Sequence, residues 1–222
     1  MCGRFTRLKN LREIMKRFNI QIPEIISADL TEKNDFIVPG QDVWIVYCEG
    51  GKNILAPHRW GLVPPWAKDS KTGSKMINAR VETIAEKPSF KNSFLNSRCL
   101  IIADGYYEWL KQGTKKTPYH FHLDSRELFG FAGIRSWWQD GQESLQTCAM
   151  ITAPAHEKIA EIHPRMPVII APELEKEWLN PHLKNPEALR QLLRNNRNDG
   201  LEYQELSVKR PGNTRQISLW DD

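Results

Sequence analysis

The sequence has few cysteines, and none of them lie close together: only four occur in 222 residues, about fifty positions apart. Zinc ribbons, thioredoxin-like redox sites and small disulfide scaffolds all depend on closely spaced cysteines. The sequence therefore excludes these classes. It predicts free thiols in a reducing compartment, at Cys2, Cys48, Cys99 and Cys148.

Long apolar segments are also missing. The sequence has no run of about 18 apolar residues, so it encodes no transmembrane helix. Its first five residues, Met1–Phe5, lack the apolar core of a secretory signal. These absences predict a cytoplasmic protein that has no membrane partner.

Strong charge of one sign is absent as well. The 31 Lys and Arg residues against 27 Asp and Glu leave a net charge of +4, which excludes a polycationic coat protein and an acidic disordered tail. The charge is unevenly spread, because residues 1–120 hold 19 basic and 12 acidic side chains (+7) and residues 121–222 hold 12 and 15 (−3). A net charge of +4 is therefore compatible with one basic face on the protein.

Hydrophobic periodicity predicts a β-rich α+β domain. Apolar residues at helical spacing predict an amphipathic helix over residues 8–18. Because strands and helices do not alternate as βαβ units, and the length and 40% hydrophobic content suit one core, we expect a single α+β domain. Further helices are predicted at 155–162, 172–179 and 185–195, strands at 43–48, 98–103, 119–123, 128–134, 146–152 and 166–170, and loops at 39–40, 61–66 and 68–75.

Cys2 is the first candidate for chemistry, because removal of Met1 would make it the N-terminal residue. Such a cysteine carries a primary amine and a thiol on adjacent carbons. The amine, much less basic than that of lysine, can attack an aldehyde to form a Schiff base, which the thiol can close to a thiazolidine. Alternatively, the thiol alone is the nucleophile of an N-terminal hydrolase or amidotransferase. The position of Cys2 alone is equally consistent with a small buried residue that follows a retained Met1.

Two further segments carry polar groups that suit acid–base or phosphate chemistry. Alternation in residues 76–83 would place Asn78, Arg80 and Glu82 on one face, although a polar edge strand has the same pattern. In residues 103–109, Glu108 lies between two aromatic residues, where partial desolvation would raise its pKa and suit an acid–base catalyst. An Asp-Gly hairpin turn with an exposed Glu108 is an equally common arrangement.

Residues 162–167 contain His163 and Arg165 between two prolines that fix the backbone. A histidine held in this way suits a proton shuttle and the arginine suits a phosphate, but a lone histidine is more often structural. His120 and His122 share a strand face, yet no third ligand has suitable spacing, so we expect no metal site. Trp66 follows two prolines in a loop and is the best candidate for stacking on a base.

Taken together, six segments in this order resemble the SRAP family, the SOS response-associated peptidases or abasic-site-processing proteins. They are residues 1–4, 38–40, 59–64, 78–83, 103–109 and 162–167. The resemblance implies one β-rich domain over residues 1–210, with barrel-like mixed sheets flanked by helices, and a tail over residues 211–222. It also implies a bacterial, nucleoid-associated protein without a cofactor.

The resemblance further implies an enzyme of the DNA damage response that binds abasic sites in single-stranded DNA and crosslinks to the sugar aldehyde. Met1 would be removed autocatalytically, and Schiff-base chemistry of the lyase type would follow. The catalytic roles of the family fall on Cys2, Asn78, Glu108 and His163. The phosphate contacts fall on Arg4, Arg80 and Arg165, and the residues that wedge between bases are Pro39 and Trp66.

The chain departs from the family pattern in two places. Phe36 replaces the asparagine of the usual Asn-x-Ala-Pro loop, and Pro164 replaces a polar residue after the histidine. The segment Gln216–Trp220 resembles a peptide that docks on bacterial sliding clamps, although an ordinary C-terminal strand explains it as well. Two other functions stay open: an N-terminal peptidase or amidohydrolase, and a non-covalent single-strand DNA-binding module. A monomer is expected, because the mechanism needs one active site.

Overall fold

The computed structural model describes residues 2–20, 33–194 and 200–206, and the segment Gln216–Trp220 lies outside these residues. One sheet has five strands in the order β13 (Leu201–Glu205), β8 (Lys115–Leu123), β7 (Gly105–Gln112), β1 (Arg4–Arg7) and β2 (Asn34–Ile37). The larger sheet runs β11 (Arg165–Pro167), β10 (Glu143–Pro154), β4 (Lys52–Trp60), β3 (Asp42–Glu49), β6 (Arg98–Ala103), β9 (Phe129–Asp140) and β12 (Ile169–Ile170), with β5 (Asn78–Arg80) paired to β10.

The larger sheet closes on itself. Strands β9 and β10 pair with each other along most of their length, so the path β10-β4-β3-β6-β9 returns to β10 as a five-stranded barrel. Its β4–β10 and β5–β10 pairs are parallel and the others are antiparallel. This mixed, barrel-like arrangement confirms the expected α+β fold.

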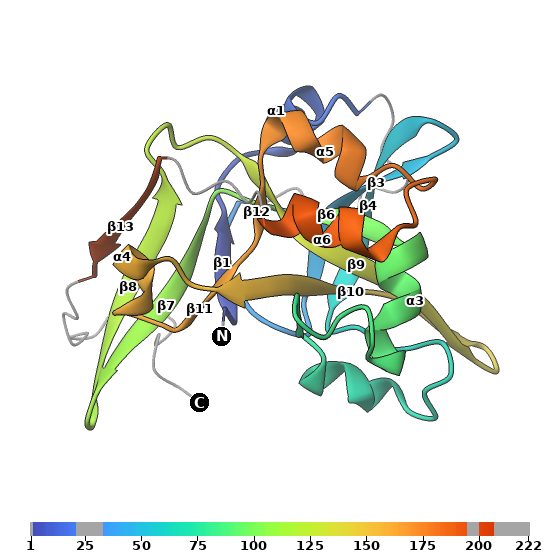
Figure 1. The fold of residues 1–222 in the computed structure, drawn as a ribbon, viewed down its shortest axis with the longest axis horizontal. Coiled ribbons are helices and arrows are strands. Elements are labelled where there is room, and N and C mark those ends of the chain that lie inside the picture. Colours follow the sequence, from blue (N-terminus) through green and yellow to red (C-terminus); the bar gives the residue numbers. More distant parts are fainter. Residues whose placement is uncertain (1, 21–32, 195–199, 207–222) are drawn as a thin grey trace.

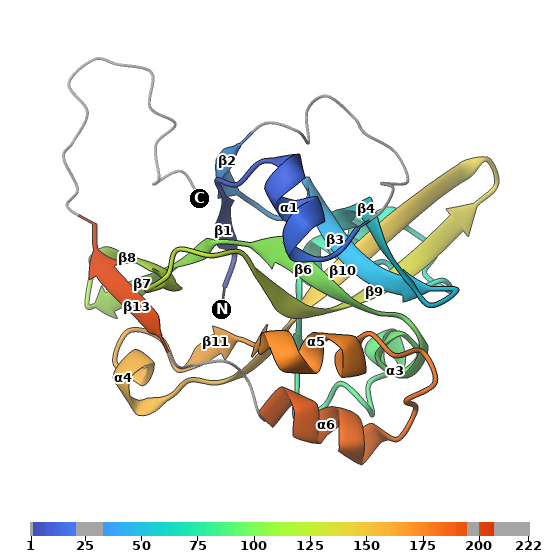
Figure 2. The same cartoon turned by 90° about the horizontal axis from the view of Figure 1, so that it is seen from above.

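Helices cover the barrel on the side away from the five-stranded sheet (Figure 1). They are α3 (Pro88–Asn96), α5 (Pro172–Trp178) and α6 (Pro186–Arg194), with α1 (Leu11–Arg17) above them and the short α4 (Glu157–Ala160) near β13. Seen from above, β1 lies between β7 and the barrel (Figure 2). One buried apolar cluster lies under the helices, and a second, which includes Cys2, fills the space between the two sheets.

The predicted elements are confirmed where their apolar pattern is strong. Strand β6 has the expected bounds because all six of its residues are buried. The first helix begins at Leu11 rather than at residue 8, because Asn10 caps its N-terminus. The Asn10 side chain accepts a hydrogen bond from the backbone amide of Glu13, and the Glu13 side chain accepts one from the backbone amide of Asn10. The loop predicted over residues 68–75 contains a 3₁₀ helix, η1 (Ser70–Lys75), which Asp69 caps.

The Asp-Gly sequence between β6 and β7 is not a hairpin turn. The two strands it joins belong to different sheets, so Asp104 and Gly105 carry the chain from the barrel to the five-stranded sheet. A Cβ atom at Gly105 would clash with His120 Nε2 and would lie 2.8 Å from the Phe121 carbonyl oxygen. Only glycine permits this close approach of β7 to β8.

Asp104 fixes the N-terminal strand to this crossing. Its carboxylate accepts hydrogen bonds from Thr6 Oγ1 at 2.6 Å, the Leu8 amide at 2.5 Å and the Lys9 amide at 3.1 Å. Because the carboxylate is buried, these donors have no ready replacement in water. Asp104 therefore sets the position of β1 relative to β7.

We expect Asp104→Ala to lower the free energy of unfolding by about 3 kcal/mol, since three donors lose a charged acceptor. Urea denaturation measures this loss. The matched variant Asp104→Asn keeps one acceptor oxygen and should lose about half as much. An alanine variant as stable as the wild type would contradict the anchoring role.

Candidate functional site

Cys2 lies in the buried cluster between the two sheets, and its side chain is fully inaccessible to solvent. Its carbonyl oxygen accepts a hydrogen bond from Asn78 Nδ2 at 2.8 Å, and its thiol donates to the Arg4 carbonyl oxygen at 3.7 Å. Burial, and then the nearby charge of Glu108, raise the pKa of the thiol well above its ordinary value. The thiol is therefore neutral at rest.

Glu108 is buried on β7, with only 3% of its surface exposed, so the alternative of an exposed glutamate after a turn is wrong. Strand β7 pairs with β1 so that Tyr107 lies opposite Arg4, which brings Glu108 beside the chain that leads to Cys2. Burial raises the pKa of Glu108 to about 7, while the positive charge of the α-amino group acts in the opposite direction. This carboxyl group can therefore both give and take a proton near neutral pH.

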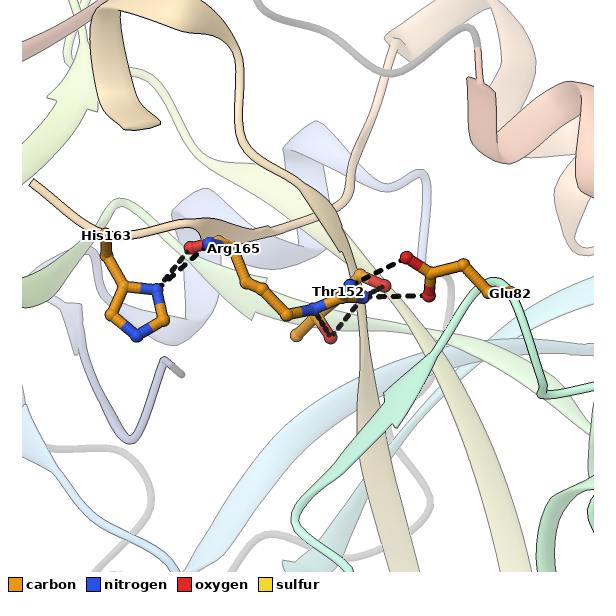
Figure 3. Close-up of polar contacts among 4 residues, drawn as sticks. All are labelled: Glu82, Thr152, His163 and Arg165. Carbon is orange, nitrogen blue, oxygen red and sulfur yellow. Dashed lines mark hydrogen bonds and ion pairs between the residues drawn. The ribbon is translucent and has the colours of Figure 1, made fainter. Parts of the chain in front are cut away.

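His163 is close to Glu108, with 3.9 Å between His163 Nδ1 and Glu108 Oε1. The same nitrogen lies 3.1 Å from the backbone nitrogen and 2.9 Å from the carbonyl oxygen of Arg165, so it can accept or donate according to the tautomer (Figure 3). Burial lowers the pKa of His163, which favours the neutral ring. A neutral imidazole beside a carboxyl group can pass on a proton.

Arg165 makes a two-pronged ion pair with Glu82 (Figure 3). Its Nη1 and Nη2 donate to the two carboxylate oxygens of Glu82 at 2.7 and 3.1 Å, and Nη2 also donates to the Thr152 carbonyl oxygen at 2.7 Å. The hydrogen bonds from Arg165 lower the pKa of Glu82. A phosphate would have to compete with this carboxylate for the guanidinium group.

The structure places the other two arginines differently. Arg80 is exposed at the end of β5, two residues from the half-buried Asn78. The guanidinium group of Arg4 lies 5.1 Å from the centre of the Phe36 ring and 4.9 Å from that of Trp109, both cation–π distances. Phe36, which departs from the family pattern, therefore makes a cation–π contact with Arg4.

The loops of Pro39 and Trp66 meet at the end of β4. The Gly40 amide, next to Pro39, donates a hydrogen bond to the carbonyl oxygen of Trp60, the last residue of β4. The loop that carries Trp66 begins directly after Trp60. Trp138 Nε1 donates to the Ala67 carbonyl oxygen at 2.7 Å and holds that loop against β9. Trp66 itself is 63% exposed. An exposed tryptophan on an anchored loop suits stacking against a base.

Sequence reasoning missed two polar groups of this region. Asp104 stood out only as part of an Asp-Gly turn, and its three hydrogen bonds depend on tertiary contacts. The sequence did not single out Tyr106, whose buried hydroxyl makes no hydrogen bond within the described structure. In the sequence, the spacing of two residues between Tyr106 and Glu108 was the signal that their side chains share one face of β7.

The described residues were also compared with the requirements of a metal site and of a membrane-spanning helix. His120 and His122 have ring centres 5.6 Å apart, but no group of three or more His, Cys, Asp or Glu side chains in the described ranges could hold a metal ion. Burial lowers the pKa of His120 to about 4. None of the helices in residues 2–20, 33–194 and 200–206 combines the length and apolarity needed to cross a bilayer.

Comparisons with known proteins find relatives over most of the chain. The family model described as SOS response associated peptidase (SRAP) matches residues 1–210. The abasic site processing protein YoqW of Bacillus subtilis (strain 168) is 42% identical over 209 residues, covering 93% of this chain and 92% of its own. YedK of Escherichia coli (strain K12), which has the same descriptive name, is 30% identical over 190 residues, covering 85% and 83%.

A solved protein of Bacteroides thetaiotaomicron shares the fold. Its structure superimposes with a TM-score of 0.84 at 24% identity, covering 93% of this chain and 92% of that one. A second, from Bordetella bronchiseptica, has a TM-score of 0.76 at 22% identity, with 93% and 100% covered.

Proposed function

The chain belongs to the SOS response associated peptidase (SRAP) family, and from this premise we propose that it processes abasic sites in single-stranded DNA by a covalent crosslink through Cys2. The observation that carries the proposal is the position of Cys2, which is hydrogen-bonded to Asn78 and lies within the electrostatic reach of Glu108. Residues 1–210 form the active domain in this proposal. The protein acts as a monomer in the response to DNA damage.

The first step is removal of Met1, which gives Cys2 a free α-amine. Glu108 is placed to assist this cleavage as a general base, because its pKa near 7 lets it take a proton from the attacking nucleophile. In this proposal the same buried Glu108 assists both the autocatalytic removal of Met1 and the later lyase-like step. The N-terminal hydrolase remains the second candidate, favoured by the same thiol.

The amine then attacks the aldehyde of the open-chain abasic sugar. A carbon–nitrogen bond forms, the carbonyl oxygen takes a proton, and water leaves to give the imine. Protonated Glu108 supplies the proton for ring opening and for the departing water, and His163, 3.9 Å away, relays it. The thiol finally adds to the imine carbon, and its proton passes to the nitrogen to complete a thiazolidine.

Asn78 positions the reacting groups. Its Nδ2 holds the Cys2 carbonyl oxygen at 2.8 Å, while its buried Oδ1 has no hydrogen-bond partner in the described structure. This free acceptor suits a hydroxyl group of the sugar or of the carbinolamine intermediate. Such positioning can supply much of the reduction in the barrier.

Single-stranded DNA fits this site for a physical reason. Cys2 is fully buried, and a stacked and paired flank would keep the sugar out of its reach. Pro39 and Trp66 are proposed to separate the flanking bases, while Arg4, Arg80 and Arg165 bind phosphates. For Arg165 this requires exchange of the Glu82 carboxylate for a phosphate oxygen.

A denaturing gel tests the proposal. Purified full-length protein, with Met1 removal verified by mass, is mixed with a single-stranded oligonucleotide that carries one abasic site. We expect a heat-resistant shifted band, and none with an intact oligonucleotide of the same sequence. A protein that binds the DNA without any covalent band would favour the non-covalent module, and cleavage of peptides without DNA linkage would favour the hydrolase.

Trp66→Ala is expected to weaken non-covalent binding of single-stranded DNA by about 1–3 kcal/mol, the usual contribution of one base stacked on an aromatic ring. Fluorescence anisotropy at fixed salt measures the Kd. Trp137→Ala is the matched control, because Trp137 is 65% exposed on β9 and has no proposed role. Equal losses for both variants would remove Trp66 from the DNA interface.

A further inference from the structure

The ion pair between Arg165 and Glu82 lies among the residues proposed to bind DNA, and Glu82 takes no part in the chemical steps proposed above. Three neighbouring strands bring the pair together: Arg165 begins β11, Glu82 follows the end of β5, and Thr152 lies on β10 between them. Figure 3 shows the Arg165 side chain reaching past Thr152 to the Glu82 carboxylate. A carboxylate therefore lies where the proposal requires a phosphate.

Both edges of the Arg165 guanidinium group that offer two parallel donors are already in use. Nη1 and Nη2 donate to the two carboxylate oxygens of Glu82 at 2.7 and 3.1 Å. On the other edge, Nε and Nη2 donate to Thr152 Oγ1 at 3.4 and 3.2 Å, and Nη2 also donates to the Thr152 carbonyl oxygen at 2.7 Å. Arginine binds a phosphate best through two parallel donors. A phosphate cannot bind Arg165 in this way while Glu82 is in place.

Glu82 is the partner that can leave. Its side chain is 44% exposed, whereas that of Arg165 is 14% exposed and is hydrogen-bonded to the backbone of Thr152. An ion pair that is open to water on one side adds little to stability, so stability alone does not account for this contact. Hydrogen bonds from Arg165 lower the pKa of Glu82, which keeps the carboxylate charged at neutral pH. An incoming phosphate thus meets a negative charge that it must replace.

This competition affects how the protein selects damaged DNA. An undamaged strand presents the same phosphates as an abasic strand, and only the abasic strand offers an aldehyde. Tight binding of phosphates would hold the protein on undamaged strands, because phosphate contacts dominate the affinity for nucleic acid. Weaker phosphate contacts lower the affinity for both strands, but only the abasic strand is then retained by a covalent bond. A weak non-covalent step therefore favours the damaged strand when undamaged DNA is in excess.

We propose that Glu82 is a specificity-determining residue: its carboxylate takes the place of a DNA phosphate on Arg165 and so keeps the affinity for undamaged single strands low. The inference rests on the proposed function, because it requires that Arg165 contacts the DNA backbone. When DNA binds, Glu82 turns toward solvent and phosphate oxygens take over the Nη1 and Nη2 donors of Arg165. No covalent bond forms or breaks in this exchange.

Fluorescence anisotropy with a labelled, undamaged single-stranded oligonucleotide tests the exchange in the processed full-length protein. Glu82→Gln keeps an acceptor oxygen but removes the charge that a phosphate must displace. We expect its Kd at low salt to be about tenfold lower than that of the wild type, the effect of one hydrogen bond to a charged group. A Kd equal to or higher than that of the wild type would overturn the inference.

The salt dependence of the Kd gives a readout that a purely structural role would not change. Each phosphate that a protein neutralises on a single strand makes the slope of log K against log salt concentration steeper by about 0.7. Glu82→Gln makes Arg165 available for one such contact, so its slope should be steeper by about this amount. The gain in affinity should largely disappear when Arg165→Gln is added. An unchanged slope, or a gain that persists in the double variant, would contradict an exchange on Arg165.

Glu86→Gln is the matched control. Glu86 lies in the turn that follows β5, and its 70% exposed side chain pairs with Arg190 of α6 at 3.4 Å rather than with Arg165. The substitution removes the same charge and should leave the Kd and the salt slope at their wild-type values. If Glu82→Gln does not fold, Glu82→Asp serves instead, because its shorter carboxylate reaches Arg165 less well. It should bind undamaged strands more tightly than the wild type, and an unchanged Kd would count against the proposal.

Selection itself is measured by crosslinking to an abasic oligonucleotide in the presence of excess undamaged strand. The concentration of undamaged strand that halves the crosslinking rate should be about tenfold lower for Glu82→Gln than for the wild type, in line with its Kd. Equal inhibition of both proteins would exclude a role of Glu82 in specificity. Absence of any adduct with wild-type protein would instead defeat the proposed function, and the anisotropy comparison, which needs no covalent step, would still test the exchange.

Discussion

Cys2→Ala is expected to abolish the covalent band completely, while the affinity for single-stranded DNA stays within about twofold of the wild type. The reason is that alanine keeps the amine but removes the sulfur that closes the ring, and an imine alone hydrolyses during heating. The proposed phosphate and base contacts lie on other residues, so binding should survive. The denaturing gel and fluorescence anisotropy measure these two effects on the same sample.

The control for this prediction is Cys48→Ala. Cys48 is a half-buried free thiol, more accessible than Cys2, but it has no amine on the adjacent carbon. It should crosslink like the wild type. A band that persists in Cys2→Ala and disappears in Cys48→Ala would contradict the assignment, whereas a band in Cys2→Ser that needs borohydride would show that the amine attacks first.

Glu108→Gln protein whose Met1 removal has been verified by mass is expected to crosslink about 100-fold or more slowly near neutral pH, the usual contribution of a general acid–base group. With a Glu108 pKa of about 7, the wild-type rate should pass through a maximum near neutrality. It falls at lower pH as the amine becomes protonated, and at higher pH as Glu108 loses its proton. The variant should lose the alkaline fall, and a variant rate equal to that of the wild type would exclude Glu108 as the acid.

The same substitution has a predictable effect on stability. Folding raises the pKa of Glu108 from 4.5 to about 7, because burial penalises the charged form more than the protonated form. This contribution to the free energy of unfolding is fully present below about pH 4.5 and is lost as pH rises through 7, to a total of about 3 kcal/mol. Thermal unfolding should therefore show Glu108→Gln more stable than the wild type at about pH 8, with little difference at low pH.

The sequence by itself determined the class of fold. Strand β6 could be predicted to the residue because the five residues that follow Arg98 form a continuous apolar run. The starts of α5 and α6 could be predicted to within one residue because each helix begins with proline. It also singled out Cys2, because the chemistry of an N-terminal cysteine is local and needs no partner. Strands such as β7 were missed, since a half-buried strand with mixed polar residues has a weak pattern.

Only the tertiary structure decided the state of the groups around Cys2. The pairing of β1 with β7 joins segments about a hundred residues apart, and this contact buries Glu108 and raises its pKa. Tertiary contacts also pair Arg165 with Glu82, so the guanidinium group is already occupied. Desolvation and hydrogen bonding depend on what surrounds a side chain in space, so the residue types followed from the sequence and their chemical states from the fold.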